Sequence, residues 1–236
     1  RGVAVEFARA GTDVAIVYNT KKDVAEEVAQ KIRSAGRRAS IHKADVRNRS
    51  EVASAFSEAV SEHGRIHTVV WGAGPVVPQE LIAEWTEEKF RRSMEIEAFG
   101  FNNAVQVALP HMRQKGGGSF VHLGSAGHAW WPLRDGLSVV PKACNEALIK
   151  GIAKEEGRHE IRANSILVGV IDAGQFQIGK AAGTFTPEWE AAVKAMLPLK
   201  RWGTPRDIGQ AAVFLASNRA NYITGQTIAV AGGFGV

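Results

Sequence analysis

Short apolar segments rich in valine and isoleucine alternate with amphipathic helical segments along almost the whole sequence, and this alternation constrains the fold more than any other feature. It is typical of βαβ units, in which parallel strands form a sheet and the connecting helices cover both of its faces. We therefore expect an α/β fold of three layers, with a doubly wound parallel sheet between two layers of helices. The expected strands span residues 13–18, 38–43, 67–71, 118–123, 162–167 and 227–230.

Helical periodicity marks the segments between these strands. After the first strand, for example, Val28 and Ile32 fall on one apolar stripe of a helix. A long helix is expected over residues 86–112 and another over residues 138–156. The last helix is opened by Pro205, because proline is favoured in the first turn.

We interpret the chain as one domain over residues 1–236, because no repeat or low-complexity linker divides it. Residues 173–199 contain three glycines and no expected strand, so this segment has the length and composition of a mobile substrate lid. The alternative is a surface excursion with one helix. Residues 1–11 have helical spacing and a glycine stop, so the sequence begins inside a helix.

Composition excludes several classes of function. The net charge of +5 comes from basic residues scattered among acids, so we expect no nucleic-acid partner. No apolar run is long enough to span a bilayer, which predicts a protein without membrane segments. The single cysteine, Cys144, excludes an internal disulfide and a CxxC metal site, so we expect a cytoplasmic protein and no metal site. Cys144 itself is expected to be buried in its helix.

Four stretches match the motifs of a known family. The most specific is the C-terminal region, which runs from Arg201-Trp202-Gly203-Thr204-Pro205 to Gly232-Gly233. The others are Asp45-Val46, the run Trp71-Gly72-Ala73-Gly74, and the run from Ala163 to Ile171, in which Val168 replaces a proline. Together they resemble the short-chain dehydrogenase/reductase family, and the resemblance covers essentially the whole chain.

The resemblance implies a Rossmann-type fold around a nicotinamide cofactor, a small-molecule substrate and a homo-oligomer, either a dimer or a tetramer. It also implies that the family's first strand and glycine-rich phosphate loop precede Arg1, so we expect the natural chain to be longer. The cofactor-binding residues that it implies are Asn19, Thr20, Lys21, Asp45, Val46, Gly72, Ala73, Gly74, Lys142, Gly169 and Ile171.

The residues after the strand at 13–18 bear on the choice of cofactor. Family members that bind NAD place an acid there for the ribose hydroxyls, whereas members that bind NADP use neutral or basic groups. Here no carboxylate precedes Asp23, and Lys21 or Lys22 could pair with a 2′-phosphate. We therefore favour NADPH. If the lysines are only solvated residues at the start of a helix, NADH is the alternative.

The resemblance also locates the active site. In most family members a serine polarises the substrate carbonyl, a tyrosine thirteen residues later donates the proton, and a lysine four further on supports the tyrosine and holds the ribose. This spacing selects Ser125, Ser138 and Lys142, so a serine replaces the tyrosine. The family's proton-relay asparagine falls on Glu97. Two of the four groups are therefore substituted.

These substitutions limit the chemistry, because a serine hydroxyl is much less acidic than a phenol and Ser138 is a poor general acid. Hydride transfer to a conjugated C=C is less affected, since the developing enolate needs mainly an oxyanion donor. The candidate proton sources are Asp135, His128, Glu97 and water. The alternative for Asp135 is a helix cap paired with Arg134, and the alternative for His128 is a surface-loop position.

We therefore predict an NADPH-dependent oxidoreductase that transfers hydride to a carbonyl, an imine or a conjugated C=C such as that of an enoyl thioester. Trp130 and Trp131 predict a hydrophobic or flat substrate, and His122 is expected to be a core residue. The alternative is a catalytically silent subunit with a regulatory or scaffolding role. The candidate catalytic residues are Ser125, Ser138, Lys142, Asp135 and His128.

Overall fold

The expected strands all form, and every pairing between them is parallel. The structure, a computed structural model, describes residues 1–235. The strands are β1 (Val14–Tyr18), β2 (Ala39–Lys43), β3 (Thr68–Trp71), β4 (Gly118–Ser125), β5 (Ile161–Val168) and β6 (Thr227–Val230). They form two sheets rather than the expected one, with orders β1-β2 and β3-β4-β5-β6, because β1 and β3 share no ladder hydrogen bonds.

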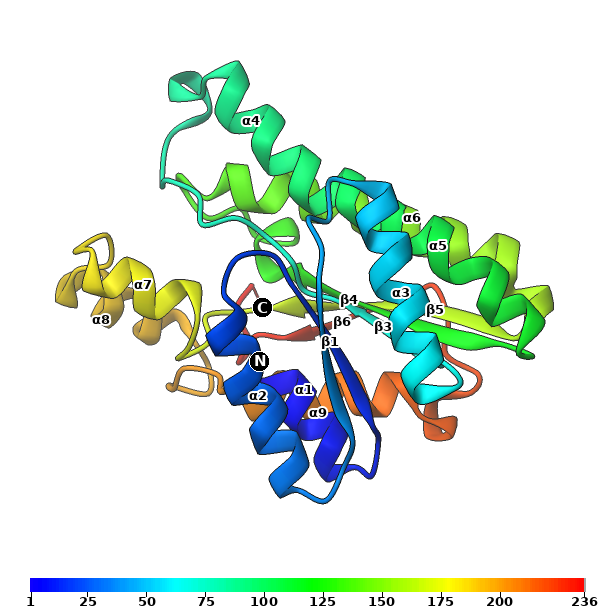
Figure 1. The fold of residues 1–236 in the computed structure, drawn as a ribbon. Coiled ribbons are helices and arrows are strands. Elements are labelled where there is room, and N and C mark those ends of the chain that lie inside the picture. The colour runs from blue at the N-terminus through cyan, green and yellow to red at the C-terminus, as the bar shows by residue number, and fades with distance from the viewer. Residues whose placement is uncertain (236) are drawn as a thin grey trace.

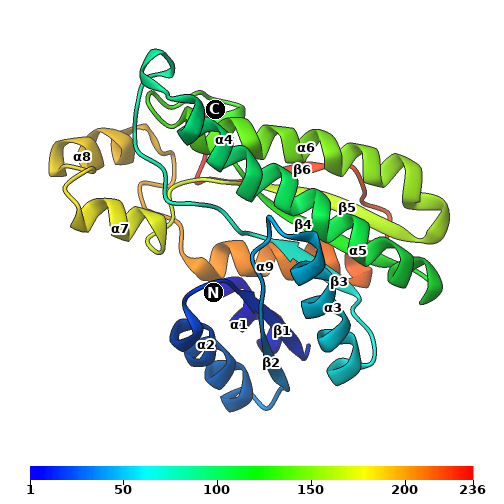
Figure 2. The same ribbon diagram turned by 45° about the horizontal axis from the view of Figure 1, so that its top comes forward.

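Helices lie on both faces of the four-stranded sheet, which confirms the α/β layering (Figure 1). Figure 2 shows α4, α5 and α6 on one side of this sheet and α1 and α9 on the other. The helices are α1 (Gly2–Arg9), α2 (Lys22–Ser34), α3 (Arg49–His63), α4 (Glu87–Met94), α5 (Gly100–Gln114), α6 (Gly136–Glu156), α7 (Gln175–Ala181), α8 (Pro187–Met196) and α9 (Pro205–Ala216).

Two hydrophobic cores explain why both faces of this sheet are covered. Successive side chains of a strand point to opposite faces, so Phe120 and Val121 on β4 belong to different cores. Phe120 packs with Phe101 and Ile149 on the side of α5 and α6. Val121 packs with Ile208 on the side of α1 and α9. A strand buried on both faces has a nearly continuous apolar sequence, as the sequence pattern indicated.

The long helix expected over residues 86–112 is interrupted. It begins at Glu87 and ends at Gln114, but the segment Glu95–Phe99 is a π-helical turn between α4 and α5. The π turn joins α4 and α5 directly. The apolar periodicity of the sequence therefore did not reveal this change in the type of helix. Such π turns often occur at functional sites.

The segment 173–199 contains two helices, α7 and α8, rather than one. Their packing rests on an aromatic cluster in which Phe176 contacts Phe185, Trp189 and Trp202, with ring centroids 5.3–6.2 Å apart. The cluster gives this segment a small core of its own. Its role as a lid stays a prediction.

Cys144 is exposed, so the prediction that it is buried was wrong. The buried stripe of α6 includes Asn145 and Ile149, which face the sheet. Cys144 lies on the opposite side of the helix with the exposed residues Ala147 and Lys150. Ala147 is three positions from both Cys144 and Lys150, and residues three apart are neighbours on a helix surface, so this side is consistently outward.

None of the helices within residues 1–235 combines the length and apolar character that crossing a membrane requires.

An ion-pair cluster joins the starts of β1 and β2 and predicts a pH effect on stability. Asp13 accepts hydrogen bonds from the backbone N–H and the guanidinium of Arg38, at 2.9 and 2.8 Å, and pairs with Arg37 at 2.8 Å. The hydrogen bonds from Arg38 lower the pKa of Asp13 from 3.8 to about 2. A carboxylate whose pKa falls on folding stabilises the protein above its unfolded value, and this contribution is lost as the pH falls toward the folded value.

We therefore expect wild-type stability to decline between about pH 4 and pH 2 more steeply than that of Asp13→Asn. Urea unfolding midpoints measured across this range would check the difference. Asp23→Asn, which removes an exposed carboxylate at the start of α2, is the matched control. Equal acid sensitivity of the wild type and Asp13→Asn would contradict the role of this cluster.

Candidate active site

Most of the predicted site residues follow the carboxyl ends of the strands. Parallel strands end at one edge of a sheet, so side chains after successive strands are brought together there. Within the chain, Asn19, Thr20 and Lys21 follow β1, Asp45 and Val46 follow β2, Gly72, Ala73 and Gly74 follow β3, Ser125 ends β4, and Gly169 and Ile171 follow β5. The two sheets meet at this edge, since Gly100 lies against both Val46 and Trp71.

Ser125 is held by the turn that follows β4. Its Oγ accepts a hydrogen bond from the backbone N–H of Gly127 at 3.1 Å, in the short 3-10 turn Ala126–His128. One lone pair of the Ser125 hydroxyl oxygen therefore accepts the hydrogen bond from Gly127, and the hydroxyl hydrogen is left to donate to another acceptor. This arrangement suits a donor to a substrate oxygen.

Ser138 and Lys142 are one turn apart on α6, and the Lys142 Nζ lies 3.3 Å from the Ser138 Oγ. Pro141 stands inside this helix and has no N–H for the carbonyl of Leu137. The hydroxyl of Ser93 on α4 donates to that carbonyl instead. This bond from a neighbouring helix compensates the proline and fixes the turn that carries both site residues.

Glu97 places a carboxylate beside Lys142. Its carboxylate forms an ion pair with Lys142, and the side chains are only 3% and 16% exposed. Burial raises the pKa of Glu97 in spite of the opposing effect of the Lys142 charge. Gly74 makes room for the carboxylate, because a β-carbon at that residue would lie 2.3 Å from Oε1. The site thus contains a partly desolvated acid beside its lysine.

Asp135 is the N-cap residue of α6, as the alternative held, but it does not pair with Arg134. Its side chain makes no capping bond, and it accepts a hydrogen bond from Gln79 at 2.8 Å. Arg134 instead pairs with Glu84. Burial raises the pKa of Asp135, with the Gln79 bond and the Lys142 charge opposing the rise. No sequence signal indicated the contact with Gln79.

His128 is exposed on the loop after β4, as the alternative held, and its Nδ1 contacts the carboxylate of Glu146. Glu146 is buried on α6, one turn after Lys142, and burial raises its pKa. Glu146 was not among the site residues expected from the sequence, although its four-residue spacing from Lys142 placed it on the same face of the helix. The carboxylate fixes the orientation of the imidazole and leaves its Nε2 directed away from the pair.

His122 is a core residue, as predicted. It is fully buried in β4, and its Nδ1 lies 2.9 Å from the Ser165 hydroxyl. Burial, with a smaller contribution from the Lys142 charge, lowers the pKa of His122 to about 3. The imidazole is therefore neutral near physiological pH and takes part in packing rather than in proton transfer.

The edge of the sheets has features that fit a nicotinamide cofactor. Gly72 and Gly74 are exposed, so a flat ligand can approach their backbone closely. Helix α1 begins at Gly2, beside Pro205 and near the bridge between Ile171 and Gly203.

Asp45 follows β2, and its carboxylate accepts hydrogen bonds from Arg47 that lower its pKa. Its role toward an adenosine group stays a prediction.

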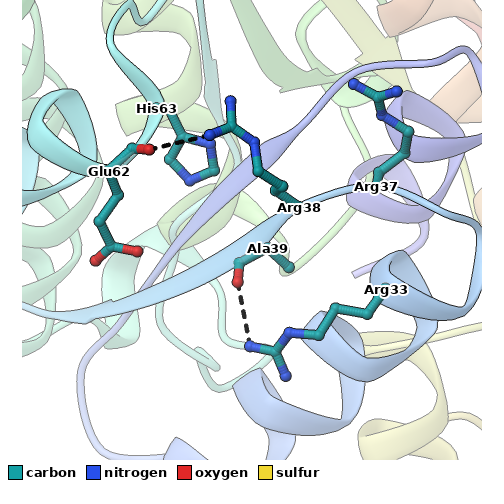
Figure 3. Close-up of a pocket in the computed structure, with 6 residues that line it drawn as sticks. All are labelled: Arg33, Arg37, Arg38, Ala39, Glu62 and His63. Atoms are coloured by element: carbon teal, nitrogen blue, oxygen red, sulfur yellow. Dashed lines mark hydrogen bonds between the residues drawn. The ribbon is translucent and has the colours of Figure 1, made fainter.

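A surface hollow lies away from these residues (Figure 3). Its lining comes from the end of α2, the start of β2 and the end of α3, which is the amino edge of the strands. Arg33, Arg37 and Arg38 point in different directions there, and Arg38 donates to the carbonyl of Glu62 at 3.3 Å. The hollow therefore does not contain the predicted site.

The residues that the structure describes contain no cluster of three or more His, Cys, Asp or Glu side chains arranged to hold a metal ion. Neither of the chain's two tyrosines reaches the site from a position equivalent to the missing one. Tyr18 ends β1, and Tyr222 is 99% exposed near the C-terminus.

Comparison with known proteins agrees with the geometry. The sequence model of the family described as "Enoyl-(Acyl carrier protein) reductase" matches residues 1–235. The 3-oxoacyl-[acyl-carrier-protein] reductase of Staphylococcus epidermidis is 30% identical over 233 residues, 99% of this chain and 93% of that protein.

Two solved structures extend the likeness to the fold. A short-chain type dehydrogenase/reductase from Mycobacterium ulcerans is 31% identical with a TM-score of 0.91, covering 98% of this chain and 84% of that one. A 7α-hydroxysteroid dehydrogenase complexed with NADH and 7-oxo glycochenodeoxycholic acid is 29% identical with a TM-score of 0.89, covering 98% and 88%. The parallel strands, the edge that carries Ser125 and Lys142, and these matches together show that the chain belongs to the short-chain dehydrogenase/reductase family.

Proposed function

We propose that this chain is an NADPH-dependent oxidoreductase that transfers hydride to a carbonyl, an imine or a conjugated C=C, with a proton donor other than tyrosine. The observation that supports this most strongly is the position of Lys142, whose Nζ lies 3.3 Å from the Ser138 hydroxyl at the carboxyl edge of the sheet. The family's lysine and serine are therefore present in a fold that binds nicotinamide cofactors in its relatives.

The proposed cofactor site follows the strand ends. When bound, the nicotinamide cofactor would supply the hydride. Lys142 would hold the ribose nearest the nicotinamide, with Gly169 and Ile171 beneath the ring. The adenosine half would be held by Asn19, Thr20, Asp45, Val46, Gly72, Ala73 and Gly74. We favour NADPH because Lys21 and Lys22 are exposed where a 2′-phosphate would lie.

In the substrate site, Ser125 donates its hydroxyl hydrogen to the substrate oxygen, because its own oxygen already accepts from Gly127. A donor placed where negative charge develops stabilises the transition state. Ser138, Asp135 and His128 are the other candidate polar groups of the proposed substrate site. Asp135 has a pKa raised by burial, and His128 is anchored through Glu146.

The substrate is proposed to be a small hydrophobic molecule. Trp130 and Trp131 are 53% and 44% exposed on the loop after Ser125, and Leu133 is 79% exposed. Large exposed apolar side chains beside a polar site favour an apolar ligand. The segment 173–199 would act as the lid of this one domain. As the family resemblance implies, we also propose a homo-oligomer, a dimer or a tetramer, in the cytoplasm.

The test is NADPH and NADH oxidation by the chain against a panel of ketones, imines and enoyl thioesters. We expect turnover on at least one class, with NADPH preferred over NADH. Lys21→Glu should reverse that preference, because an acid repels the 2′-phosphate and accepts hydrogen bonds from ribose hydroxyls. Tight cofactor binding without turnover on any compound in the panel would contradict the proposal.

One observation favours the alternative, a catalytically silent subunit with a regulatory or scaffolding role. The ammonium of Lys142 is already paired with Glu97, a residue that stands where the family's relay has asparagine. A silent subunit would bind cofactor without oxidising it. Its function would be unchanged by Glu97→Asn or by Ser138→Tyr. A reductase limited by its proton donor would instead gain ketone reductase activity in Ser138→Tyr.

A further inference from the structure

Three side chains from two helices form a continuous hydrogen-bonded row at the proposed site. The Lys142 Nζ contacts the carboxylate of Glu97 on one side and lies 3.3 Å from the hydroxyl of Ser138 on the other. We propose that Glu97, Lys142 and Ser138 form a proton relay that delivers the proton normally supplied by the absent tyrosine. The proposal rests on the proposed reductase function and names its proton donor.

The row has the order that a relay requires. Ser138 replaces the tyrosine that donates the proton in most family members, so we place it as the terminal donor. Lys142 is next, and Glu97 lies behind it, within the π turn between α4 and α5. The side chains of Glu97 and Lys142 are 3% and 16% exposed, so the pair lies largely away from bulk water. Low exposure strengthens the hydrogen bonds that hold the row together.

The chemistry overcomes the weak acidity of serine. Hydride addition to a carbonyl carbon leaves an alkoxide on the substrate oxygen, whose basicity is close to that of a serine alkoxide. Ser138 can therefore give its proton to the substrate with little change in free energy, provided that Lys142 protonates the Ser138 oxygen at the same time. The O–H bond of Ser138 breaks as a new one forms, and an N–H bond of the ammonium supplies the replacement.

Glu97 completes the cycle. After the transfer Lys142 is a neutral amine, and the Glu97 carboxylate takes a proton from solvent and passes it to that amine. One proton is consumed for each carbonyl reduced, and the hydride comes from the cofactor class that the proposed function names. A carboxyl whose pKa is raised by burial can take up a proton closer to neutral pH than an exposed glutamate can.

The other candidate proton donors, Asp135 and His128, form hydrogen bonds to side chains outside this row. Asp135 accepts its hydrogen bond from Gln79, and the Nδ1 of His128 is bound to Glu146. The groups that feel the charge of Lys142 are Glu97, Asp135 and His122. His122 is buried and neutral, so the pH response of the row should reflect Glu97 first and Asp135 second.

Kinetics of a double-mutant cycle test the relay. Glu97→Gln keeps the size of the side chain and removes its proton exchange, and Ser138→Ala removes the terminal donor. We expect each to lower kcat for ketone reduction by roughly a hundredfold, with NADPH affinity retained. Because members of one relay act as a unit, the double variant should lose no more than either single variant. Glu88→Gln, an exposed change on α4, is the charge control.

Two further readouts separate a relay from a structural role. In a Ser138→Tyr background, where a phenol donates directly, Glu97→Gln should cost much less than it does in the wild type. Infrared titration should show a carboxyl band that is absent in Glu97→Gln and whose midpoint moves in Lys142→Met. The second measurement needs no turnover.

Losses that multiply in the double variant, or an unchanged kcat in Glu97→Gln, would overturn the relay while leaving the reductase proposal intact. If no compound is turned over, the reductase proposal fails, and the infrared titration still decides whether Glu97 and Lys142 share a proton. A Glu97 midpoint that does not respond to Lys142→Met would overturn the proposal independently of activity.

Discussion

Replacing Lys142 by methionine should lower kcat/KM for the reduction by roughly a thousandfold. The substitution removes the ammonium that contacts both Glu97 and Ser138, and with it the proposed hold on the cofactor ribose. Methionine keeps much of the length and apolar volume of the lysine stem, so the helix should pack as before. Steady-state kinetics with NADPH and the best compound of the panel would measure the loss.

The same substitution should also destabilise the fold, because it leaves Glu97 buried without its partner. Breaking a buried ion pair by removing one member costs about 3 kcal/mol or more, whereas replacing both members with apolar groups is often neutral. We therefore expect Glu97→Leu combined with Lys142→Met to recover most of the unfolding free energy without recovering activity. Urea unfolding and kinetics on the same three proteins would separate the two effects.

A double variant with wild-type activity would show that neither residue takes part in the reaction. A Lys142→Met variant as stable as the wild type would show that the ion pair with Glu97 does not contribute to the stability of the fold.

Replacing Phe120 by alanine should reduce the free energy of unfolding by about 3–5 kcal/mol. Phe120 is fully buried in β4 and stacks edge to face with Phe101 at a centroid distance of 6.4 Å. The loss combines the transfer of the removed ring atoms with the cavity left between the sheet and α5. For a domain of this size, the loss corresponds to a drop in Tm of about 10 °C.

Phe99→Ala is the matched control, because Phe99 is 62% exposed in the π turn and its ring has little burial to lose. Its midpoint in urea should stay close to that of the wild type. If both alanine variants lose the same stability, burial against the sheet is not what makes Phe120 important.

The positions of the strands were predictable from the sequence because each strand consists of a short local run of apolar residues. β4 illustrates this, since Phe120 and Val121 are adjacent, apolar and buried on opposite faces. The expected and observed strands differ by no more than two residues at either end. The position of Ser125 at the end of β4 follows from the same pattern.

Contacts between distant segments were not predictable in this way. The pair Glu97–Lys142 joins residues 45 positions apart, and it depends on the π turn that directs Glu97 toward Gly74. The bond from Gln79 to Asp135 spans 56 positions. Periodicity reports which face of an element is apolar, but it does not report which polar group of another element will meet a given side chain.

The sequence by itself determined the class of fold, the strand order along the chain and the spacing of Ser125, Ser138 and Lys142, because these depend on local propensity and on side chains one helical turn apart. Only the tertiary structure decided how those residues are charged and paired. The acid beside Lys142, the partner of His128 and the exposure of Cys144 depend on which segments α6 meets when it packs. Burial and distance, which set electrostatic energies, exist only once those elements have packed.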